Sequence, residues 1–370
     1  MKAVILVGGE GTRLRPLTVN APKPMIPVLN RPFLEHVLDY LRRYGINDVI
    51  LSMGYRSEVI TNHFGDGRDF GVNLLYVHEE TPLGTAGAVK NAEQHLDGTC
   101  FVFNGDILTS LDLGAMLEFH RQKKSMVTIS LVPVEDPTAY GLVELDDDRR
   151  VQRFIEKPTW DRVTTNLVNA GTYIVEPEVF RYVPPKLYYM FEHGLFPVLL
   201  QTGDPMYGYP SNCYWIDIGT PQKYLGLHRD LLTGRAETVM PGKRLKEGVW
   251  VDAECDIDPT AHLVSPVVLG KGVAIGPHST ITGPVVMGDG CRVGRDSVVE
   301  DAVIWRETRV GNSVTMKTCV VGEGSQIDDH CWITGGAIIG DHCLVGANNK
   351  MEHAIRIWPG KSIGPGTITF

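Results

Sequence analysis

Residues 3–18, AVILVGGEGTRLRPLT, join an apolar run to a glycine-rich loop, and Arg13 and Arg15 come directly after the bend. The run from Lys2 to Val7 is short and continuously apolar after its first residue, which is typical of a strand buried on both faces of a parallel sheet. Glycine allows a tight turn and leaves the backbone N–H groups uncovered, so an anion can approach them closely. The stretch therefore predicts a buried strand that opens into an anion-binding loop.

The glycines of this loop are Gly8, Gly9 and Gly11. A glycine-rich turn after a strand can also serve only to reverse the chain, and this loop matches neither of two phosphate signatures. It lacks the closing glycine of the dinucleotide fingerprint, since TRL follows Gly11, and it lacks the GK[ST] ending of a P-loop. If phosphate binds here, the site is of another type.

Strand-like and helix-like stretches alternate outward from this loop. The apolar runs read DVILSMGY, VNLLYVHE, CFVFNGDI and SMVTISLVPV, and helices are expected at Pro32–Tyr44, Gly84–His95 and Leu113–Lys123. The alternation predicts an α/β, Rossmann-like fold, with a mostly parallel mixed sheet and helices on both of its faces. In such sheets ligands bind at the carboxyl ends of the strands.

The pattern changes near residue 245, where apolar residues begin to recur at every sixth position. The register slips by one residue twice, and the apolar positions are Val251, Ile257, Leu263, Leu269, Ile275, Ile281, Met287, Val293, Val299, Trp305, Val310, Met316, Val321, Ile327, Ile333, Ile339 and Val345. A hexapeptide repeat predicts a left-handed parallel β-helix, in which each turn stacks its apolar residue on the coil below. We therefore expect an α/β domain over residues 1–245 and a β-helix domain over residues 246–370.

Composition and charge narrow the class of function. The chain has 370 residues and a formal net charge of −9, which argues against a nucleic-acid surface. Its apolar runs are too short to span a membrane. Its N-terminal residues read directly as a strand and do not have the pattern of a signal peptide. We expect a cytoplasmic protein that binds neither membranes nor nucleic acids.

Cysteines and histidines of the repeat have ordinary explanations. The seven cysteines are odd in number and form no CxxC pair, which favours neither a disulfide framework nor a zinc site. Four of them share a repeat position with valine and serine, which predicts buried, inert thiols: Cys255, Cys291, Cys331 and Cys343. Histidines such as His330 and His342 raise the alternative of acyl transfer with a histidine base, but no acyl-donor site accompanies them.

Charged residues near strand ends are candidates for the site. Asp106 follows the strand-like CFVFNG, and Asp217 interrupts the apolar run in NCYWIDIGT. Aspartates leaving two strands of one sheet can converge on Mg²⁺, although each can instead cap a helix or turn. Lys23 lies between Pro22 and Pro24, which restrict its backbone; it can reach the same cleft or remain a solvated surface lysine.

The motifs GGEGTRLRPLT, PKPM, FNGDIL, YGLVEL, FIEKP, VNAGTYI and YWIDIG, in this order, resemble those of the sugar-1-phosphate nucleotidyltransferases. HEETPLGTAGAVKNA and the tail ending KSIGPG look most like the guanylyltransferase members that act on mannose 1-phosphate. The resemblance implies that GTP and mannose 1-phosphate give GDP-mannose and pyrophosphate, with Mg²⁺ as the cofactor. Thymidylyl- and uridylyltransferases of glucose 1-phosphate are the alternative within the family.

The resemblance also implies roles for individual residues. Arg13, Lys23 and Asp106 would be catalytic, Asp106 and Asp217 would bind Mg²⁺, and Arg15 would support the loop. The nucleotide-binding residues would be Leu6, Gly8, Gly9, Gly11, Thr12, Arg13, Glu79, Pro82, Gly84, Thr85, Asn104 and Asp106. The sugar-phosphate-binding residues would be Gly141, Glu156, Lys157 and Asn169.

A carboxylate in HEETPLGTAG bears on the choice of base. Guanine presents two adjacent N–H donors that one carboxylate can accept, whereas thymine and uracil suit an amide better. Glu79 stands where many thymidylyl and uridylyl members carry glutamine, which favours GTP; the adjacent Glu80 is a second candidate, and either can be a surface charge. Glu156 can accept hydrogen bonds from sugar hydroxyls but does not distinguish mannose from glucose.

Two further readings stay open at this stage. A non-catalytic regulatory subunit would keep the fold and sense a nucleotide sugar, but such proteins usually lose loop or metal residues that this chain retains. The β-helix could carry a second, acyltransferase activity, which would require an acyl-donor site within residues 249–370. We expect that the β-helix serves assembly into a homo-oligomer or regulation.

Overall fold

The computed structural model describes residues 1–369, which form two compact units. The first unit contains residues 1–10 and 34–217, and the second contains residues 11–33 and the chain from Ile218 onward. The chain thus leaves the first unit within the glycine-rich loop and returns to it at Leu34. The predicted domain boundary between residues 245 and 246 falls inside the second unit.

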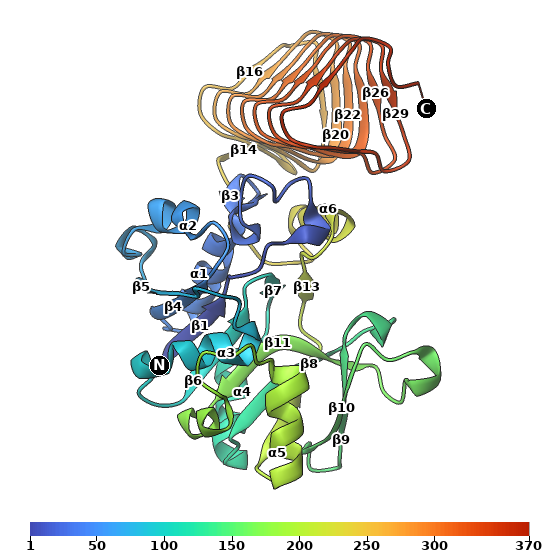
Figure 1. The fold of residues 1–370 in the computed structure, drawn as a ribbon. Coiled ribbons are helices and arrows are strands. Elements are labelled where there is room, and N and C mark those ends of the chain that lie inside the picture. Colours follow the sequence, from blue (N-terminus) through green and yellow to red (C-terminus); the bar gives the residue numbers. More distant parts are fainter. Residues whose placement is uncertain (370) are drawn as a thin grey trace. The chain divides into compact units, whose positions relative to one another are not determined.

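A mixed sheet forms the centre of the first unit (Figure 1). Its strands are β1 (Lys2–Leu6), β4 (Asp48–Met53), β5 (Asn73–His78), β6 (Cys100–Asn104), β8 (Val127–Pro133), β9 (Gly141–Leu145), β10 (Val151–Glu156), β11 (Leu167–Val175) and β12 (Met206–Pro210). They follow the order β10-β9-β11-β6-β1-β4-β5, with β8 and then β12 beside β11. Strands β6, β1, β4 and β5 are parallel, whereas β11 is antiparallel to β6. Ala3, Val4 and Ile5 of β1 are fully buried, as the sequence predicts for a central strand.

The α-helices of the first unit are α1 (Phe33–Arg43), which begins at the last residue of the inserted segment, α2 (Ser57–Phe64), α3 (Gly84–Asn91), α4 (Leu113–Lys123) and α5 (Phe196–Thr202). Three of them, α1, α3 and α4, lie at the predicted positions, whereas α2 and α5 were not predicted. Asp112 caps the N-terminus of helix α4, and its carboxylate accepts a hydrogen bond from the Ala115 N–H at 3.0 Å. The helix expected over 84–95 ends earlier, and its last turn is a separate 3-10 turn, Glu93–His95. No helix within residues 1–369 has both the length and the apolar character needed to cross a membrane.

The second unit consists mainly of a parallel β-helix, drawn in orange and red in Figure 1. It is preceded by helix α6 (Pro221–Leu232). Its strands are β14 (Lys243–Lys246), β15 (Val249–Val251), β16 (Asp256–Ile257), β17 (His262–Val264), β18 (Val267–Leu269), β19 (Ala274–Ile275), β20 (Thr280–Met287), β21 (Arg292–Val293), β22 (Val298–Ile304), β23 (Arg309–Val310), β24 (Thr315–Val321), β25 (Gln326–Ile327), β26 (Trp332–Ile333), β27 (Ile338–Ile339), β28 (Leu344–Val345), β29 (Lys350–Met351), β30 (Arg356–Ile357) and β31 (Ser362–Ile363). Each coil lies in register on the next, as where Leu269 pairs with Met287.

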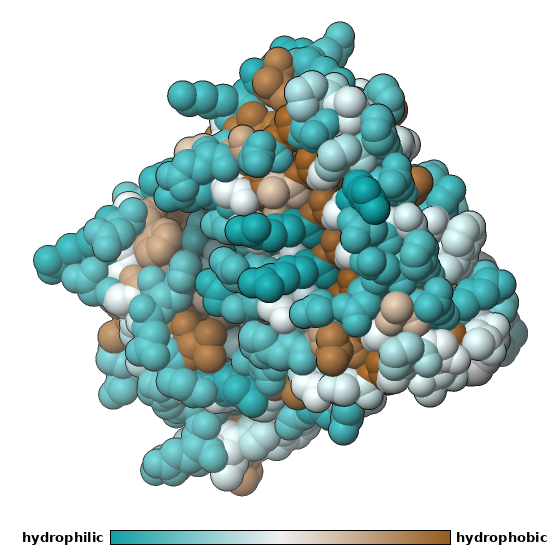
Figure 2. Space-filling model, turned by 90° about the horizontal axis from the view of Figure 1, so that it is seen from above, coloured by the Kyte–Doolittle hydropathy of each residue, from teal (hydrophilic) through white to brown (hydrophobic). Residues whose placement is uncertain are grey.

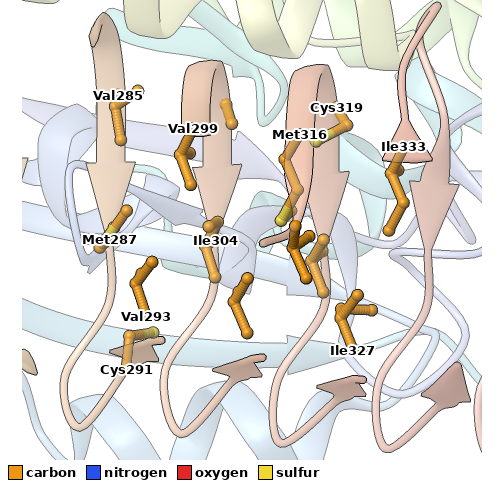
Figure 3. Close-up of a cluster of buried hydrophobic side chains, with 14 of the residues drawn as sticks. Val285, Met287, Cys291, Val293, Val299, Ile304, Met316, Cys319, Ile327 and Ile333 are labelled. Atoms are coloured by element: carbon orange, nitrogen blue, oxygen red, sulfur yellow. The ribbon is translucent and has the colours of Figure 1, made fainter. Parts of the chain in front are cut away.

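The interior of the β-helix is filled by the apolar position of the repeat. The prediction was wrong at Trp305: Ile304 pairs with Met287 and occupies the core there, whereas the Trp305 indole donates a hydrogen bond to the Tyr224 hydroxyl. Figure 3 shows Met287, Val293, Val299 and Ile304 pointing into one continuous core. Cys291 lies in the same core, and burial raises the pKa of its thiol to about 12. Because such a thiol stays protonated at neutral pH, the cysteine acts as a small packing residue, as predicted.

One outer face of the β-helix is also apolar. The middle residue of an apolar triplet points outward on successive coils and is at most 3% exposed: Val268, Val286, Val303, Val320 and Ile338. We call these residues the outer ladder. Helix α6 packs against strands β20 and β24, which carry two of them. The period of six predicts the inner core but not this second apolar surface.

Residues 11–33 pack with the β-helix and α6 as part of the second unit. They form the 3-10 turns η1 (Thr12–Leu14) and η2 (Lys23–Met25) and a short hairpin of β2 (Pro27–Val28) and β3 (Arg31–Pro32). The side-chain amide of Asn30 donates to the Met287 carbonyl at 2.8 Å. The hydroxyl of Tyr224 on α6 donates to the carbonyl of Pro27, and the Trp305 indole N–H donates to that hydroxyl at 3.0 Å.

Turn geometry accounts for the histidines of the repeat. His330 and His342 have φ values of 60° and 54°, in the left-handed region that few residues tolerate. Asn, Asp and His are the side chains most often found there after glycine, and Asp296 and Asn348 occupy similar corners. The two histidines therefore belong to a set of corner residues.

Candidate active site

Predicted nucleotide-binding residues meet at the carboxyl edge of the first unit's sheet. Leu6 at the end of β1 pairs with Asn104 at the end of β6 and with Ser52 of β4. Gly8 lies just beyond, where a Cβ would be 3.1 Å from the Glu79 Oε1 atom. Glycine at this position therefore lets the loop pass directly beside a carboxylate.

Glu79 is held in place by hydrogen bonds at both carboxylate oxygens. Its Oε2 accepts from the Leu83 N–H at 2.9 Å, and its Oε1 accepts from the Ser52 hydroxyl at 3.1 Å. Each carboxylate oxygen has a second lone pair, so the group can still accept from a ligand. The neighbouring Glu80 is exposed. Of the two candidate carboxylates, Glu79 is thus the one fixed beside the glycine loop.

The segment after Glu79 leads into helix α3 and contacts a second partly buried carboxyl group, that of Glu192. Gly84 has φ +71°, and a Cβ there would be 2.8 Å from the Tyr189 carbonyl oxygen. The Thr85 hydroxyl accepts from the Phe191 N–H at 2.9 Å and donates to Glu192 Oε2 at 3.3 Å. Burial raises the pKa of Glu192, and nearby Glu156 raises it further. Pro82 lies exposed in the same segment.

Asp106 and Asp217 are brought together by a small antiparallel sheet. Strand β13 (Trp215–Asp217) pairs with β7 (Ile107–Thr109), and Asp217 is opposite Ile107, the residue after Asp106. The Tyr140 hydroxyl donates to Asp217 Oδ2 at 3.2 Å. Gly105 permits this arrangement, because a Cβ there would lie 2.5 Å from the Leu6 carbonyl oxygen.

The paired aspartates suit a hard divalent cation. Within residues 1–369 no group of three or more His, Cys, Asp or Glu side chains could hold a metal ion by itself. Mg²⁺ commonly takes one or two carboxylates together with water and phosphate oxygens. The donor set of Asp106 and Asp217 therefore fits Mg²⁺ if substrate and water supply the remaining ligands.

The predicted sugar-phosphate residues lie on strands β9, β10 and β11. Gly141 pairs with Glu156, and a Cβ on Gly141 would be 2.9 Å from Glu156 Oε2. Lys157 follows with φ +44°, its N–H donates to the Tyr140 carbonyl at 3.0 Å, and its Nζ lies 3.8 Å from Glu156 Oε1. Asn169 lies on β11 beside an irregularity in the pairing with β8.

A polar network connects the sugar-phosphate residues to the nucleotide residues. The Asn169 amide donates to the Tyr173 hydroxyl at 2.8 Å, and Asn104 also hydrogen-bonds that hydroxyl. Asn169 Oδ1 accepts from the Gly171 N–H at 2.9 Å, where a Cβ would be 2.6 Å from Asn104 Nδ2. Burial raises the pKa of Tyr173 far above its usual value, so the hydroxyl remains protonated.

Segment 11–33 of the second unit holds the cationic candidates. Gly11 has φ +62°, and its carbonyl accepts from the Thr18 hydroxyl at 2.8 Å. A Cβ on Gly11 would be 3.2 Å from the Lys23 Cβ, so the stem of Lys23 begins against the loop. Lys23 is only 9% exposed, which excludes the solvated surface lysine, whereas Thr12 and Arg13 are exposed.

Sequence reasoning located most of these residues but missed some of their partners. Gly11, Thr12, Arg13 and Lys23 belong to the second unit, and the other candidates belong to the first. Tyr140 could have been found, because it begins the YG motif. Tyr173 could also have been found, because it lies in the motif VNAGTYI. Glu192 carries no comparable signal, since its contact with Thr85 is distant in the chain.

Comparisons with known proteins agree on both parts of the chain. Residues 2–234 match the family model described as "Nucleotidyl transferase", and residues 246–351 match "EIF2B subunit epsilon LbH domain". A mannose-1-phosphate guanylyltransferase of Mycobacterium tuberculosis is 42% identical over 278 residues, which cover 74% of this chain and 76% of the relative. A UTP–glucose-1-phosphate uridylyltransferase of Synechocystis is 33% identical over 89% of this chain and 90% of its own.

A solved structure gives a similar result for part of the chain. The crystal structure of HddC from Yersinia pseudotuberculosis, complexed with GMP-PN, is 32% identical and aligns with a TM-score of 0.54. The alignment covers 61% of this chain and 97% of that one. Over the aligned length this chain therefore has the same fold as a protein solved in complex with GMP-PN.

Proposed function

The chain belongs to the sugar-1-phosphate nucleotidyltransferase family, and from this we propose that it transfers guanosine monophosphate from GTP to mannose 1-phosphate. The products would be GDP-mannose and pyrophosphate. The observation that carries the choice of base is Glu79, a carboxylate fixed beside Gly8 at the carboxyl edge of the sheet. Such a group can accept both N–H donors of guanine, and the similarity to a guanylyltransferase supports the same choice.

The proposed reaction needs positive charge more than it needs a base. An oxygen of the sugar phosphate attacks the α-phosphorus in line and forms a new P–O bond. The bond between the α-phosphorus and the α–β bridging oxygen breaks, and pyrophosphate leaves with its electron pair. Both reactants are anions, so the nucleophile is already deprotonated, and the main barrier comes from their mutual repulsion. Fixed cations aimed at the phosphates lower that barrier. Arg13 and Lys23 would supply this charge.

Mg²⁺ is the proposed cofactor, since enzymes of this family generally use a divalent metal. Asp106 and Asp217 would hold it. When bound, it would add positive charge next to the phosphate oxygens. The Tyr140 hydroxyl would keep Asp217 oriented through its 3.2 Å hydrogen bond.

The sugar phosphate would be bound by the β9–β10–β11 region. Glu156 can accept hydrogen bonds from sugar hydroxyls, and Asn169 is oriented by Tyr173 and Gly171. Gly141 leaves room beside Glu156, because any side chain there would contact its carboxylate. Lys157 adds a positive charge next to the same strand end.

A substrate panel tests this function. The purified protein with Mg²⁺ is offered GTP, UTP, dTTP, ATP or CTP against mannose 1-phosphate or glucose 1-phosphate, and pyrophosphate release is followed. We expect the highest kcat/KM for GTP with mannose 1-phosphate. Preference for UTP or dTTP with glucose 1-phosphate would overturn the substrate assignment and leave the reaction class standing. Release from no pair would overturn both.

We also propose that the protein acts in the cytoplasm and self-associates through the β-helix. The β-helix exposes Trp332, Leu344 and Trp358, which are 43%, 40% and 48% exposed. Figure 2 shows a face of the molecule on which hydrophobic residues form a narrow row between hydrophilic ones. Sedimentation velocity tests self-association. The wild-type chain should sediment as an oligomer, and Trp332→Ser should dissociate at higher protein concentrations than the wild type does.

A further inference from the structure

The loop between the two proposed cations is anchored to the β-helix at two points. The Arg356 guanidinium donates from Nη1 to the Arg15 carbonyl oxygen at 3.0 Å. The Asn20 side-chain amide donates to Asp341 Oδ2 at 2.9 Å. The first anchor lies two residues after Arg13 and the second three residues before Lys23. All four partners belong to the second unit.

Asp341 combines a role of the repeat with a role of its own. Its Oδ1 accepts from the Glu323 N–H at 3.0 Å, just as Asp289 Oδ1 accepts from the Lys271 N–H at 2.8 Å on an earlier coil. Asp289 is exposed, whereas Asp341 is 6% exposed because segment 11–33 covers it at Asn20. The second oxygen of Asp341 is thus committed to the loop.

Arg356 occupies a place that the repeat otherwise fills with apolar residues. It pairs with Ile338, the last member of the outer ladder, and so stands one coil beyond it. Every preceding coil from Val268 onward has valine or isoleucine at this position. The change to arginine coincides with a hydrogen bond to the loop, which an aliphatic side chain cannot make.

The loop itself has little regular structure to fix the cations. Turn η1 is three residues long, and Arg13 within it is exposed. A cation contributes most to phosphate transfer when its position is set before the substrate arrives, because no free energy is then spent on ordering it. The anchors at Arg15 and Asn20 restrict the backbone on both sides of the span that separates Arg13 from Lys23.

We propose that Asp341 and Arg356 are positioning residues, through which the β-helix sets the affinity of the segment 11–23 for the nucleoside triphosphate. This inference rests on the proposed function, because it assigns the triphosphate to Arg13 and Lys23. It gives the β-helix a part in substrate binding besides any part in self-association.

The test compares anchor variants with matched controls. The anchors are removed by Asn20→Ala, Asp341→Asn and Arg356→Ala, and the controls are Asp289→Asn and Arg309→Ala on coils that do not carry the anchors. The loss of one hydrogen bond predicts a rise of about three- to tenfold in the KM for the nucleotide. The KM for the sugar phosphate and the melting temperature should stay close to wild type. Arg356→Lys, which keeps a donor, should restore part of the affinity.

A double variant and an exchange measurement make the outcome decisive. Asn20→Ala combined with Asp341→Asn should raise the KM for the nucleotide no more than either change alone, because both changes remove the same hydrogen bond. Hydrogen–deuterium exchange of the amides of residues 11–19, without nucleotide, should be faster in each anchor variant than in the controls. This readout does not need activity, so it tests the anchors even if the wild-type protein releases no pyrophosphate and the proposed function fails. Unchanged exchange and unchanged KM, or equal effects in the controls, would overturn the inference.

Discussion

Two glycines of the first unit, Gly8 and Gly141, lie beside carboxylate side chains, whereas two glycines of the β-helix, Gly288 and Gly294, lie against the backbone of the next coil. Gly8 adjoins Glu79 and Gly141 adjoins Glu156, both at carboxylate oxygens. A Cβ on Gly288 would be 2.4 Å from the Arg306 backbone nitrogen, and one on Gly294 would be 2.5 Å from the Gly311 carbonyl oxygen. At the edge glycine makes room for a group that can contact a ligand, and in the repeat it lets two coils stack. Substitutions in the two regions should therefore change different measurements.

The largest expected effect separates charge from packing at Lys23. Lys23→Met keeps most of the buried stem and removes the ammonium group, and we expect turnover to fall by about 10²–10³-fold, the usual cost of losing one fixed electrostatic contact. Steady-state kinetics and a thermal melt measure the two effects separately. A melting temperature that fell together with the activity would show that Lys23 is mainly structural.

The next effect concerns the choice of base at the sheet edge. Glu79→Gln replaces a carboxylate with an amide that matches one guanine donor instead of two, and we expect kcat/KM for GTP to fall by about 10- to 100-fold. The ratio of UTP to GTP use should rise at the same time. Glu80→Gln is the matched control and should leave both values unchanged; an equal effect there would contradict the assignment to Glu79.

A substitution in the β-helix should affect stability alone. Gly288→Ala places a methyl group against the Arg306 backbone, and we expect a loss of about 1–3 kcal/mol in the free energy of unfolding, measured in urea. The KM values should stay within twofold of wild type. If the KM for the nucleotide rose as much as in the anchor variants, the contrast between the two regions would fail.

Gly9→Ala should affect nucleotide binding and leave stability unchanged, and its effect should be smaller. Nothing within residues 1–369 lies within 4 Å of a Cβ on Gly9, so the fold gives no steric reason for glycine there. If the loop's amides contact the triphosphate, an added methyl group should raise the KM for the nucleotide by about three- to tenfold at unchanged melting temperature. A variant with wild-type KM would remove Gly9 from the binding loop.

The smallest effect concerns acid sensitivity, which we expect from the first unit. His120 is 2% exposed, and burial lowers its pKa below the usual 6.5 even though the Glu176 carboxylate opposes the shift. The unfolded chain therefore takes up a proton first as pH falls below 6.5, and stability present above that pH is lost. In urea titrations, the free energy of unfolding should fall less between pH 7 and pH 5.5 in His120→Asn than in the wild type, by a difference of less than about 1 kcal/mol. His193→Asn, at an exposed position, should leave the slope as it is.

The sequence predicts those features that depend on neighbours along the chain. The buried strand β1, the helices near 33–43 and 113–123 and the inner core of the β-helix follow from local periodicity, and the structure confirms them. The strand-end argument also anticipates that Asp106 and Asp217 come together. The roles assigned to the site residues remain predictions.

The features that the sequence analysis missed are of two kinds. The outer ladder had a local signal in the triplets VVL, VVM, AVI, CVV and AII, since three apolar residues in a row indicate a strand covered on both faces. The assignment of residues 11–33 to the second unit had no local signal, because hydrogen bonds such as Asn20–Asp341 create it. The same holds for Glu192, whose partner Thr85 lies far away in sequence.

The anchors also constrain the order in which the protein can be made. Asn20 and Asp341 are separated by 321 residues, and Arg15 and Arg356 by 341. During synthesis the N-terminal segment leaves the ribosome long before its partners exist, so its native arrangement cannot be completed until the last coils emerge. A premature stop near residue 330 would thus leave every candidate site residue in the chain and still deprive the loop between Arg13 and Lys23 of both supports.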